Sequence, residues 1–189
     1  MPDKYKSGVR VIGGRWKGTK IIAPSAAGLR PTSDRIRETL FNWLQPRIMG
    51  AKCLDLFAGS GVLSLEALSR GASHALAVDC QLRSVEAMSS VCNRLKACGL
   101  EVRRDRAENF LERPHEDVFD IVFVDPPFDL GIQQSICAKL QEFRWLSPDA
   151  LIYVEKAGKN GFICPPGWLE LKRKHTGNVT YMLFQVPGS

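Results

Sequence analysis

From residue 51 onward the chain alternates between short apolar runs, typical of strands, and segments with helical spacing. The runs lie at 52–57, 75–79, 100–103, 119–125, 150–155, 168–174 and 179–186, and the helical segments at 62–69, 82–97, 107–112 and 131–143. The stretches IVFV and LIYV are continuously apolar, as in parallel strands that are covered on both faces. The pattern predicts an α/β fold with a doubly wound, mostly parallel seven-stranded sheet. In such a sheet a ligand binds beyond the carboxyl ends of the strands, where the strand order reverses.

The first fifty residues differ from the rest of the chain in charge. Residues 1–50 hold ten Lys and Arg and three Asp and Glu, a net charge of +7, whereas residues 51–189 hold sixteen and seventeen, a net charge of −1. A basic segment on a nearly neutral body indicates either a surface that meets a polyanion such as RNA or an ordinary solvated surface. Charge alone leaves both interpretations open. We expect one domain over 1–189, in which 1–50 form a basic extension and 51–189 the catalytic α/β core.

The extension is expected to contain a hairpin and a helix. Two β-prone runs at 9–12 and 19–22 flank a glycine-rich connection, which predicts a hairpin with Arg15, Trp16 and Lys17 at its tip. Trp16 is suited either to stacking on an unpaired base or to packing the hairpin against the body. Apolar residues at helical spacing then predict a helix that starts near residue 32 and stops before the next proline.

A glycine-rich turn follows the first predicted strand of the core. The segment LDLFAGSG passes from a strand through Phe57 into a turn, where Gly59 and Gly61 allow a ligand to approach the backbone closely. The next strand ends in Asp79, whose carboxylate is suited to both hydroxyls of a ribose. This pairing fits a nicotinamide cofactor or S-adenosylmethionine, and a purely structural turn is the alternative.

Two residues favour S-adenosylmethionine over a nicotinamide cofactor. Ser64 stands where the dinucleotide-binding fingerprint requires its third glycine. Asp55 lies inside a strand that is apolar in dinucleotide-binding proteins, and its carboxylate is suited to the cationic amino group of a methionine moiety. The loop with Arg106 and Ala107, after the third strand, is a weaker candidate for hydrogen bonds to the adenine amine.

The strongest single motif is the tetrapeptide DPPF at the end of a buried strand. The two prolines, Pro126 and Pro127, fix the backbone and remove two N–H donors, so that acceptors dominate the segment. The Asp125 carboxylate and the Pro126 carbonyl oxygen are suited to an exocyclic NH2 group of a nucleobase, and they stabilise the positive charge that grows on its nitrogen during methyl transfer. Phe128 supplies a ring for stacking on a base that has been flipped out of its helix. A structural proline turn explains the prolines but not the acid and the ring beside them.

The sequence resembles the RsmD-type small-subunit ribosomal RNA guanine-N2 methyltransferases in order over nearly its whole length. The matching segments are RVIGGRWKG (10–18), GLRPTSDRIRETLFNWL (28–44), LDLFAGSGVLSLEALSRGA (54–72), IVFVDPPF (121–128) and ALIYVEK (150–156). The block RPTSDRIRETLFNWL at 30–44 discriminates best, because methyltransferases in general lack it.

The resemblance implies a class I, Rossmann-like methyltransferase that uses S-adenosylmethionine to make N2-methylguanosine in 16S ribosomal RNA. The substrate it implies is an assembled or nearly assembled small subunit. It assigns the target amine to the DPPF motif at 125–128 and the cofactor to the turn at 55–61 and to Asp79. Cys80 and Gln81, which follow Asp79, depart from the family pattern. The RNA contacts expected in the extension are Arg10, Arg15, Trp16, Lys17, Arg30, Thr32, Arg35 and Arg37.

Several classes of protein and site are not expected. No apolar stretch approaches the roughly 20 residues of a membrane span, and the N-terminus lacks an apolar signal segment. The six cysteines are scattered without a Cys/His cluster, which argues against disulfides and a metal site and fits a reducing cytoplasm. We expect a cytoplasmic, metal-free monomer.

Two further interpretations stay open. DPP-aromatic motifs also serve the N6 amine of adenine and the N4 amine of cytosine in DNA or other RNA, and an RNA-binding assembly factor that kept the fold without the activity is a non-enzymatic rival. A second basic run, Lys172, Arg173 and Lys174, is suited either to extending an RNA surface or to protecting a strand edge from aggregation.

Overall fold

A computed structural model describes residues 8–22, 33–128, 130–159 and 161–188 of the chain. The extension contains β1 (Gly8–Arg10), a 3-10 turn η1 (Gly14–Trp16), β2 (Lys20–Ile22) and α1 (Asp34–Leu44). The remaining helices are α2 (Val62–Ser69), α3 (Leu82–Leu95), α4 (Ala107–Leu111) and α5 (Gln133–Glu142). The remaining strands are β3 (Lys52–Asp55), β4 (His74–Asp79), β5 (Leu100–Arg104), β6 (Phe119–Val124), β7 (Leu146–Ala157), β8 (Leu169–Thr176) and β9 (Val179–Gln185).

The predicted seven-stranded, mostly parallel sheet is confirmed. Its strand order is β5-β4-β3-β6-β7-β9-β8, in which only β9 runs antiparallel to its neighbours. The chain moves outward from β3 to β5 and then returns to place β6 beside β3. The strand order therefore reverses between β3 and β6, and a ligand is expected beyond their carboxyl ends.

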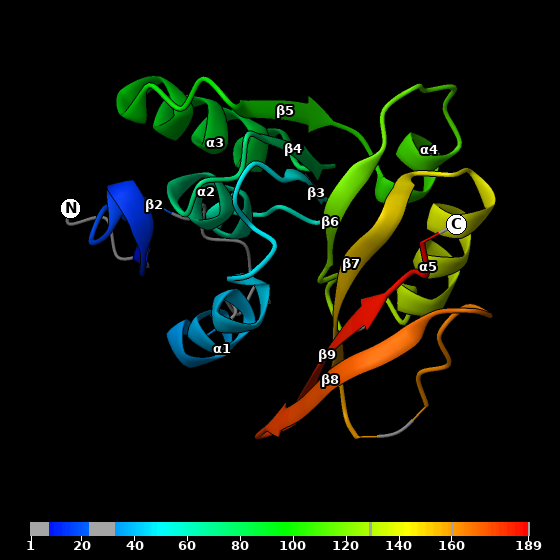
Figure 1. Ribbon diagram of the computed structural model, residues 1–189. Coiled ribbons are helices and arrows are strands. Elements are labelled where there is room, and N and C mark those ends of the chain that lie inside the picture. Colours follow the sequence, from blue (N-terminus) through cyan, green and yellow to red (C-terminus); the bar gives the residue numbers. More distant parts are fainter. Residues whose placement is uncertain (1–7, 23–32, 129, 160, 189) are drawn as a thin grey trace.

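Helices cover both faces of this sheet (Figure 1). One face carries α1, α2 and α3, and the β1–β2 hairpin lies outside α2 on the same side. The other face carries α4 and α5 around a second apolar cluster. Because both faces are covered, the central strands are apolar on both sides, as in IVFV of β6, whose four residues are all fully buried.

The elements of the extension form where the sequence predicted them. β1 pairs with β2 as an antiparallel hairpin, with Val9 opposite Ile21. Helix α1 starts after Ser33, whose hydroxyl oxygen accepts the N–H of Ile36 (3.4 Å) as an N-terminal cap.

Strand β7 starts at Leu146, four residues earlier than predicted. Leu146 pairs with Phe119, and the next pair joins Leu151 to Ile121, so a bulge absorbs the residues between them. Asp149 within this segment has φ 60°, a conformation more typical of turns than of strands. The residues SPDA at 147–150 are also typical of a turn, so the sequence did not indicate that the strand starts before them.

Candidate cofactor and substrate site

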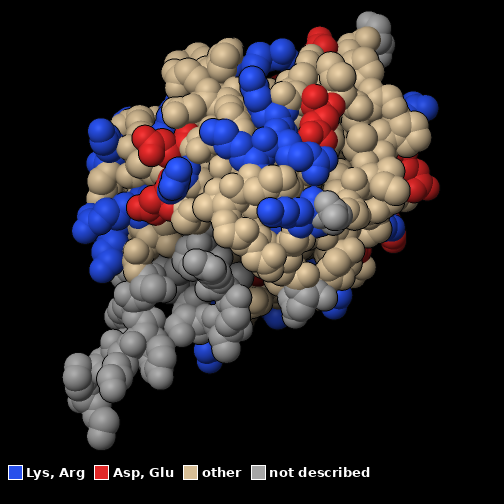
Figure 2. Space-filling model, turned by 90° about the horizontal axis from the view of Figure 1, so that it is seen from below, with Lys and Arg blue, Asp and Glu red and all other residues tan. Residues whose placement is uncertain are grey.

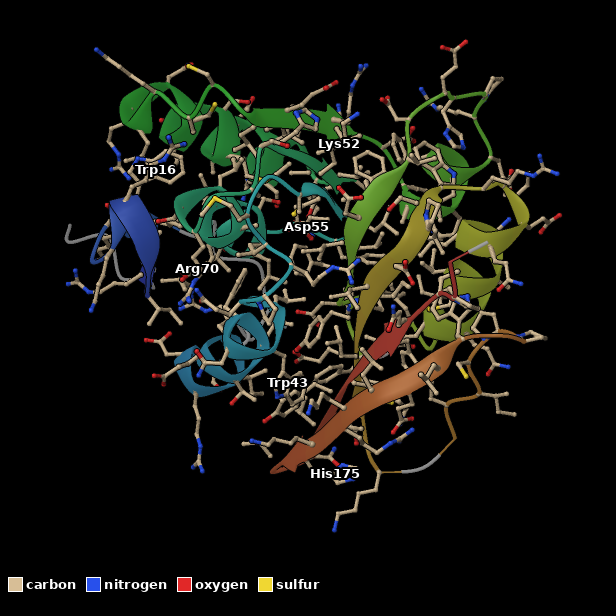
Figure 3. All side chains as sticks on the ribbon, viewed as in Figure 1. Trp16, Trp43, Lys52, Asp55, Arg70 and His175 are labelled. Atoms are coloured by element: carbon tan, nitrogen blue, oxygen red, sulfur yellow. The ribbon has the colours of Figure 1, made fainter. Side chains whose placement is uncertain are left out.

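The segments predicted to bind cofactor and substrate follow four parallel strands at one edge of the sheet. They leave β3, β4, β5 and β6, whose carboxyl ends all lie at that edge because the strands are parallel. Figure 3 shows Asp55, the last residue of β3, in the middle of the molecule. The topology thus brings together segments that are up to 70 residues apart in the sequence, since Asp55 and Asp125 differ by that number.

Both glycines of the turn after β3 adopt conformations that favour glycine. Gly59 has φ 53° and Gly61, which precedes α2, has φ 73°. A side chain on Gly61 would collide with Met88, whose nearest atom would lie 2.8 Å from the new Cβ. At Gly59 the nearest atom would lie 3.9 Å away, so the turn leaves room there for a ligand to approach the backbone.

Asp79 at the end of β4 is bonded to this turn. One carboxylate oxygen accepts the N–H of Gly59 (2.8 Å), and the other accepts the N–H of Gln81 (2.8 Å). The N–H of Ala58 also donates to the carbonyl oxygen of Val78 (3.0 Å). Each carboxylate oxygen has a second lone pair, so Asp79 retains the capacity to accept ribose hydroxyls.

Asp55 is a buried carboxyl group with an unusual acidity. It is 2 % exposed, and its side chain accepts the Ser64 hydroxyl (2.9 Å) and the backbone N–H of Phe57. The pKa of Asp55 is raised to about 7, chiefly by burial and to a smaller extent by the charges of Asp125 and Asp79, while the hydrogen bonds from Ser64 and Phe57 act to lower it. A cationic group beside Asp55 would favour the ionised form, which fits the amino group of a methionine moiety.

Ser64 is a site residue whose role the sequence analysis missed. It was recognised only as the absence of a third glycine, whereas the structure shows its hydroxyl holding Asp55. Replacing glycine with serine at this position adds the donor that a buried acid requires. A strand acid followed nine residues later by serine was the available signal.

The loop after β5 lies beside the same turn. The N–H of Asp105 donates to the carbonyl oxygen of Asp79 (3.2 Å), and its carboxylate accepts the N–H of Arg106 (2.9 Å) and pairs with Arg113 (2.5 Å). The Arg106 side chain is exposed, whereas Ala107 is buried at the start of α4. The backbone hydrogen bond from Asp105 to Asp79 therefore holds this loop beside the end of β4.

The DPPF segment leaves the end of β6 at the point where the strand order reverses. Asp125 is half-buried and Pro126 buried, whereas Pro127 and Phe128 are exposed. The N–H of Leu130 donates to the Pro127 carbonyl oxygen (3.1 Å), which closes a turn after the motif. The motif thus presents a carboxylate and an aromatic ring at the rim of the site.

Strand register places a second acid beside Asp125. Phe123 of β6 pairs with Tyr153 of β7, and Asp125 and Glu155 lie two residues farther along these strands, on the same face. The Tyr153 hydroxyl donates to Glu155 (2.7 Å), and both side chains are buried. Burial, and then the charges of Glu155 and Asp125, raise the pKa of Tyr153 well above its usual range, so the phenol remains a donor. The sequence analysis did not single out Tyr153, which reads as core.

The residues predicted to contact RNA do not share one environment. Arg10, Arg15, Lys17 and Arg35 are exposed. Arg30 and Thr32 lie outside the described residues. Trp16 is half-buried and packs against the core, its backbone N–H donates to the Ser69 hydroxyl (2.9 Å), and the Arg15 guanidinium lies 3.9 Å from the centre of its ring. Of the two roles considered for Trp16, packing against the body is the one present here.

The prediction that Arg37 contacts RNA is wrong. Its side chain is fully buried and pairs with Asp34 (2.6 Å) and Glu66 (3.7 Å), and it donates to the carbonyl oxygen of Arg10 (2.9 Å). It reads in the sequence as part of a solvated helix face. The buried Glu66 on α2, which no local pattern relates to α1, turns it inward.

Glu66 is the centre of a polar network that joins the hairpin to α2. Its carboxylate accepts the N–H groups of Ile12 (2.7 Å) and Gly13 (2.8 Å) and the Nε of Arg70 (2.7 Å). The Ser69 hydroxyl donates to the Gly13 carbonyl oxygen (2.6 Å), and Figure 3 shows Arg70 between the hairpin and α1. The hairpin is therefore bound to the helix that starts at the cofactor turn.

No helix in the described part of the chain has the length and apolarity to span a membrane. All six cysteines lie in that part and are free thiols, and no group of three or more metal-ligating side chains occurs within it.

Comparisons with known proteins agree with this geometry. A family model described as Conserved hypothetical protein 95 matches residues 9–185. The chain is 44% identical to the Escherichia coli K12 protein named ribosomal RNA small subunit methyltransferase D, over 97% of this chain and 93% of that one. It is 42% identical to the protein of the same name from Haemophilus influenzae, over 95% of each chain.

Solved structures show the same architecture. A putative methyltransferase from Escherichia coli, 40% identical, superposes with a TM-score of 0.89 over 96% of this chain and 99% of that one. A putative methyltransferase solved in complex with SAH, 16% identical, superposes with a TM-score of 0.73 over 89% of this chain and 54% of that one, which shows a shared fold. The predicted Rossmann-like methyltransferase fold is confirmed.

Proposed function

Because the chain belongs to the Conserved hypothetical protein 95 family, that of the RsmD-type ribosomal RNA small-subunit methyltransferases, we propose that it methylates the N2 amine of one guanine in 16S ribosomal RNA. S-adenosylmethionine is the methyl donor in this proposal. The observation that carries it is the strand pairing that places Phe123, two residues before Asp125 of the DPPF motif, opposite the buried Asp55 beside the glycine turn.

The residues around the turn fit S-adenosylmethionine. Asp55 is buried and its pKa is raised to about 7, so a cationic amino group bound beside it would favour the ionised carboxylate. Gly59 leaves its backbone open to a ligand, and Asp79 is held by that same backbone. The bound donor supplies an electrophilic methyl group on a sulfonium.

The DPPF motif is suited to activating a poor nucleophile. The lone pair of a guanine amine is delocalised into the ring, and acceptors that hold both N–H bonds direct it toward the incoming carbon. Asp125 and the Pro126 carbonyl oxygen are the acceptors in this proposal, and they stabilise the positive charge that forms on nitrogen before its proton leaves. Phe128, which is 40 % exposed, is available to stack on the flipped base.

The family and the charge distribution support further parts of the proposal. The substrate is an assembled or nearly assembled small subunit, and the enzyme acts as a monomer in the cytoplasm without a metal ion. Arg10, Arg15, Lys17 and Arg35, which are exposed, are the cations of the extension that this proposal assigns to RNA. Methylation of adenine N6 or cytosine N4 is the alternative that the same motif permits.

The test is methylation of ribosomal RNA from a strain that lacks this enzyme. Small subunits from that strain are incubated with pure protein and labelled S-adenosylmethionine, and the RNA is digested to nucleosides and mapped. We expect the label in N2-methylguanosine at one position of 16S RNA. Label in N6-methyladenine or N4-methylcytosine would contradict the proposal.

Asp125→Ala provides the matched control. We expect methyl transfer to fall about a hundred- to a thousandfold, because one oriented acceptor is lost. Calorimetry should show unchanged affinity for S-adenosylhomocysteine and no binding of NAD. A wild-type transfer rate in the variant would exclude the proposed role of Asp125.

A further inference from the structure

A second basic surface lies on β8, at the edge of the sheet opposite to β5. Lys172, Arg173 and Lys174 are exposed there. Figure 2 views the molecule from below, the side on which Figure 1 shows β8, and Lys and Arg side chains gather across the middle of this face. Lys172, Arg173 and Lys174 are consecutive in the chain, although residues 51–189 as a whole have no net positive charge.

Strand direction aligns β8 with the candidate site. β9 is antiparallel to β7, and β8 is antiparallel to β9, so β8 runs parallel to β7. The basic half of β8 is its C-terminal half. It therefore lies on the side of the sheet formed by the carboxyl ends of the parallel strands, where the substrate motif leaves β6.

Strand register places the two lysines level with the site carboxylates. Lys174 lies opposite Tyr181, which lies opposite Glu155, the neighbour of Asp125 in the next strand. Lys172 starts a second row across the sheet, which continues through Leu183, Tyr153 and Phe123 to Asp55. Residues directly opposite each other project to the same face, so the lysines share the face of these acids.

Side-chain contacts agree with this orientation. The ammonium of Lys174 lies 6.0 Å from the ring centre of Trp43 on α1, and Trp43 stacks on Tyr181 with ring centres 5.5 Å apart. Figure 3 shows Trp43 between α1 and the β8–β9 pair. The partner of Arg173 across the strands is Met182, which belongs to the apolar cluster on the opposite face.

The two faces of β8 differ in how their charges are balanced. Arg173 forms an ion pair with Glu170 (2.6 Å). Lys172 and Lys174 form no ion pair with any residue in the described segments of the chain. Two exposed ammonium groups without a carboxylate are therefore available to an external anion.

The lysines lie beyond the screening distance of Asp125. Strands lie about 4.8 Å apart, so the three steps from β6 to β8 span about 14 Å. This exceeds the screening length of about 8 Å at physiological salt, so the lysines do not neutralise Asp125. The basic hairpin packs against α2, where Glu66 accepts the N–H groups of Ile12 and Gly13.

We propose that Lys172 and Lys174 bind backbone phosphates of the substrate RNA, so that the edge strand β8 holds the RNA while the target nucleotide is at the DPPF motif. These contacts are additional to those expected from the cations of the extension. This inference rests on the proposed function for the identity of the polyanion. The sequence left the role of the basic run open, and the strand register selects Lys172 and Lys174 and places them level with the site.

The test is removal of the two charges by the double substitution Lys172→Gln and Lys174→Gln. Affinity for protein-free 16S RNA is measured by filter binding at salt concentrations from about 50 to 200 mM. Over this range, binding that depends on phosphate contacts weakens strongly. We expect roughly tenfold weaker binding and a plot of log affinity against log salt that is shallower by about 1.5, since each phosphate contact contributes about 0.7 to 0.9. On small subunits KM should rise while kcat and affinity for S-adenosylhomocysteine stay unchanged.

The control is the double substitution Lys52→Gln and Lys96→Gln. Both lysines are exposed, and they lie at the start of β3 and the end of α3, away from the strand ends that carry the site. This variant loses the same net charge, and we expect wild-type affinity and salt dependence. Equal losses in both double variants would overturn the proposal in favour of a general charge effect.

Two other results would also overturn it. One is an unchanged affinity and salt dependence in the β8 variant. The other is a variant that binds protein-free RNA normally but has a raised KM on subunits, which would assign the lysines to a ribosomal protein. Methylation of a base other than guanine would contradict the proposed function and leave the RNA-binding result intact, so the two failures are distinguishable.

Discussion

At the scale of single residues, Asp55 has the most consequential environment in the site. It is buried in the middle of the molecule, with Ser64 and the Phe57 N–H as hydrogen-bond donors and the charges of Asp79 and Asp125 nearby. Burial raises its pKa to about 7, so near neutrality it is present in both protonation states. A cationic ligand that favours the carboxylate therefore displaces a proton when it binds below that pH.

We predict that affinity for S-adenosylmethionine depends on pH through Asp55. The affinity should rise about tenfold per pH unit up to about 7 and then level off, because the carboxylate must be ionised to receive the cation. Calorimetry at pH 6 in two buffers of different ionisation enthalpy should detect proton release. Asp55→Asn should bind more weakly and lose this pH dependence, and a pH-independent wild type would exclude the role.

The same raised pKa affects the free protein in the opposite direction. The folded state retains a proton that the unfolded chain loses near pH 4, so the free energy of unfolding falls as pH rises from about 4 to 7. Asp55→Asn removes this penalty. We therefore expect the ligand-free variant to unfold at a higher urea concentration than wild type at pH 8.

At the scale of elements, α2 joins the cofactor turn to the extension. All eight of its residues are buried, including Glu66, and its N-terminus follows Gly61. Glu66 accepts two N–H groups from the hairpin, and its other partners, Arg37 and Arg70, come from α1 and from the end of α2. The hairpin is thus a packed layer on α2, which places its exposed cations at a fixed position relative to the site.

We predict that Glu66→Gln loosens the hairpin and destabilises the protein by about 3 kcal/mol. The amide nitrogen would face a backbone N–H donor, and the buried Arg37 would lose part of its compensating charge. Urea unfolding measures the loss, and amide hydrogen exchange should locate it in β1 and β2. Glu38→Gln, on the exposed side of α1, should change stability by less than about 0.5 kcal/mol. Equal effects would contradict the network.

At the scale of the whole molecule, the extension is part of the main core. Helix α1 buries four large apolar side chains, Ile36, Leu40, Phe41 and Leu44, in the cluster that covers one face of the sheet. Phe41 lies 6.1 Å, between ring centres, from Phe123 of β6, two residues before Asp125. The boundary near residue 50 is therefore a change in charge along the sequence and not a boundary between two cores. We expect the whole chain to be a single folding unit.

We predict that residues 51–189 alone do not fold cooperatively. Loss of the four apolar side chains of α1 removes about 6 to 12 kcal/mol, at 1.5 to 3 kcal/mol each, which is comparable to the whole stability of a domain. Circular dichroism on heating should show no sharp transition, and S-adenosylhomocysteine should not bind. A truncated chain that melts sharply and binds this ligand would show that the extension is a separate appendage.

The sequence by itself determined the order of the strands and helices, the glycine turn and the DPPF motif. Each of these rests on residues that are neighbours in the chain, because hydrophobic period, turn chemistry and proline rigidity act over a few residues. The positions of Asp55, Asp79 and Asp125 at strand ends followed from the same local patterns. Parallel strand direction then brought them to one edge.

Only the tertiary structure decided which polar residues meet. Arg37 is buried because Glu66, from another helix, faces it, and Ser64 holds Asp55 because α2 turns back over β3. Lys172 and Lys174 reach the level of the site through pairings across four strands. A polar side chain is buried or exposed according to partners far away in the sequence, and no local pattern contains that information.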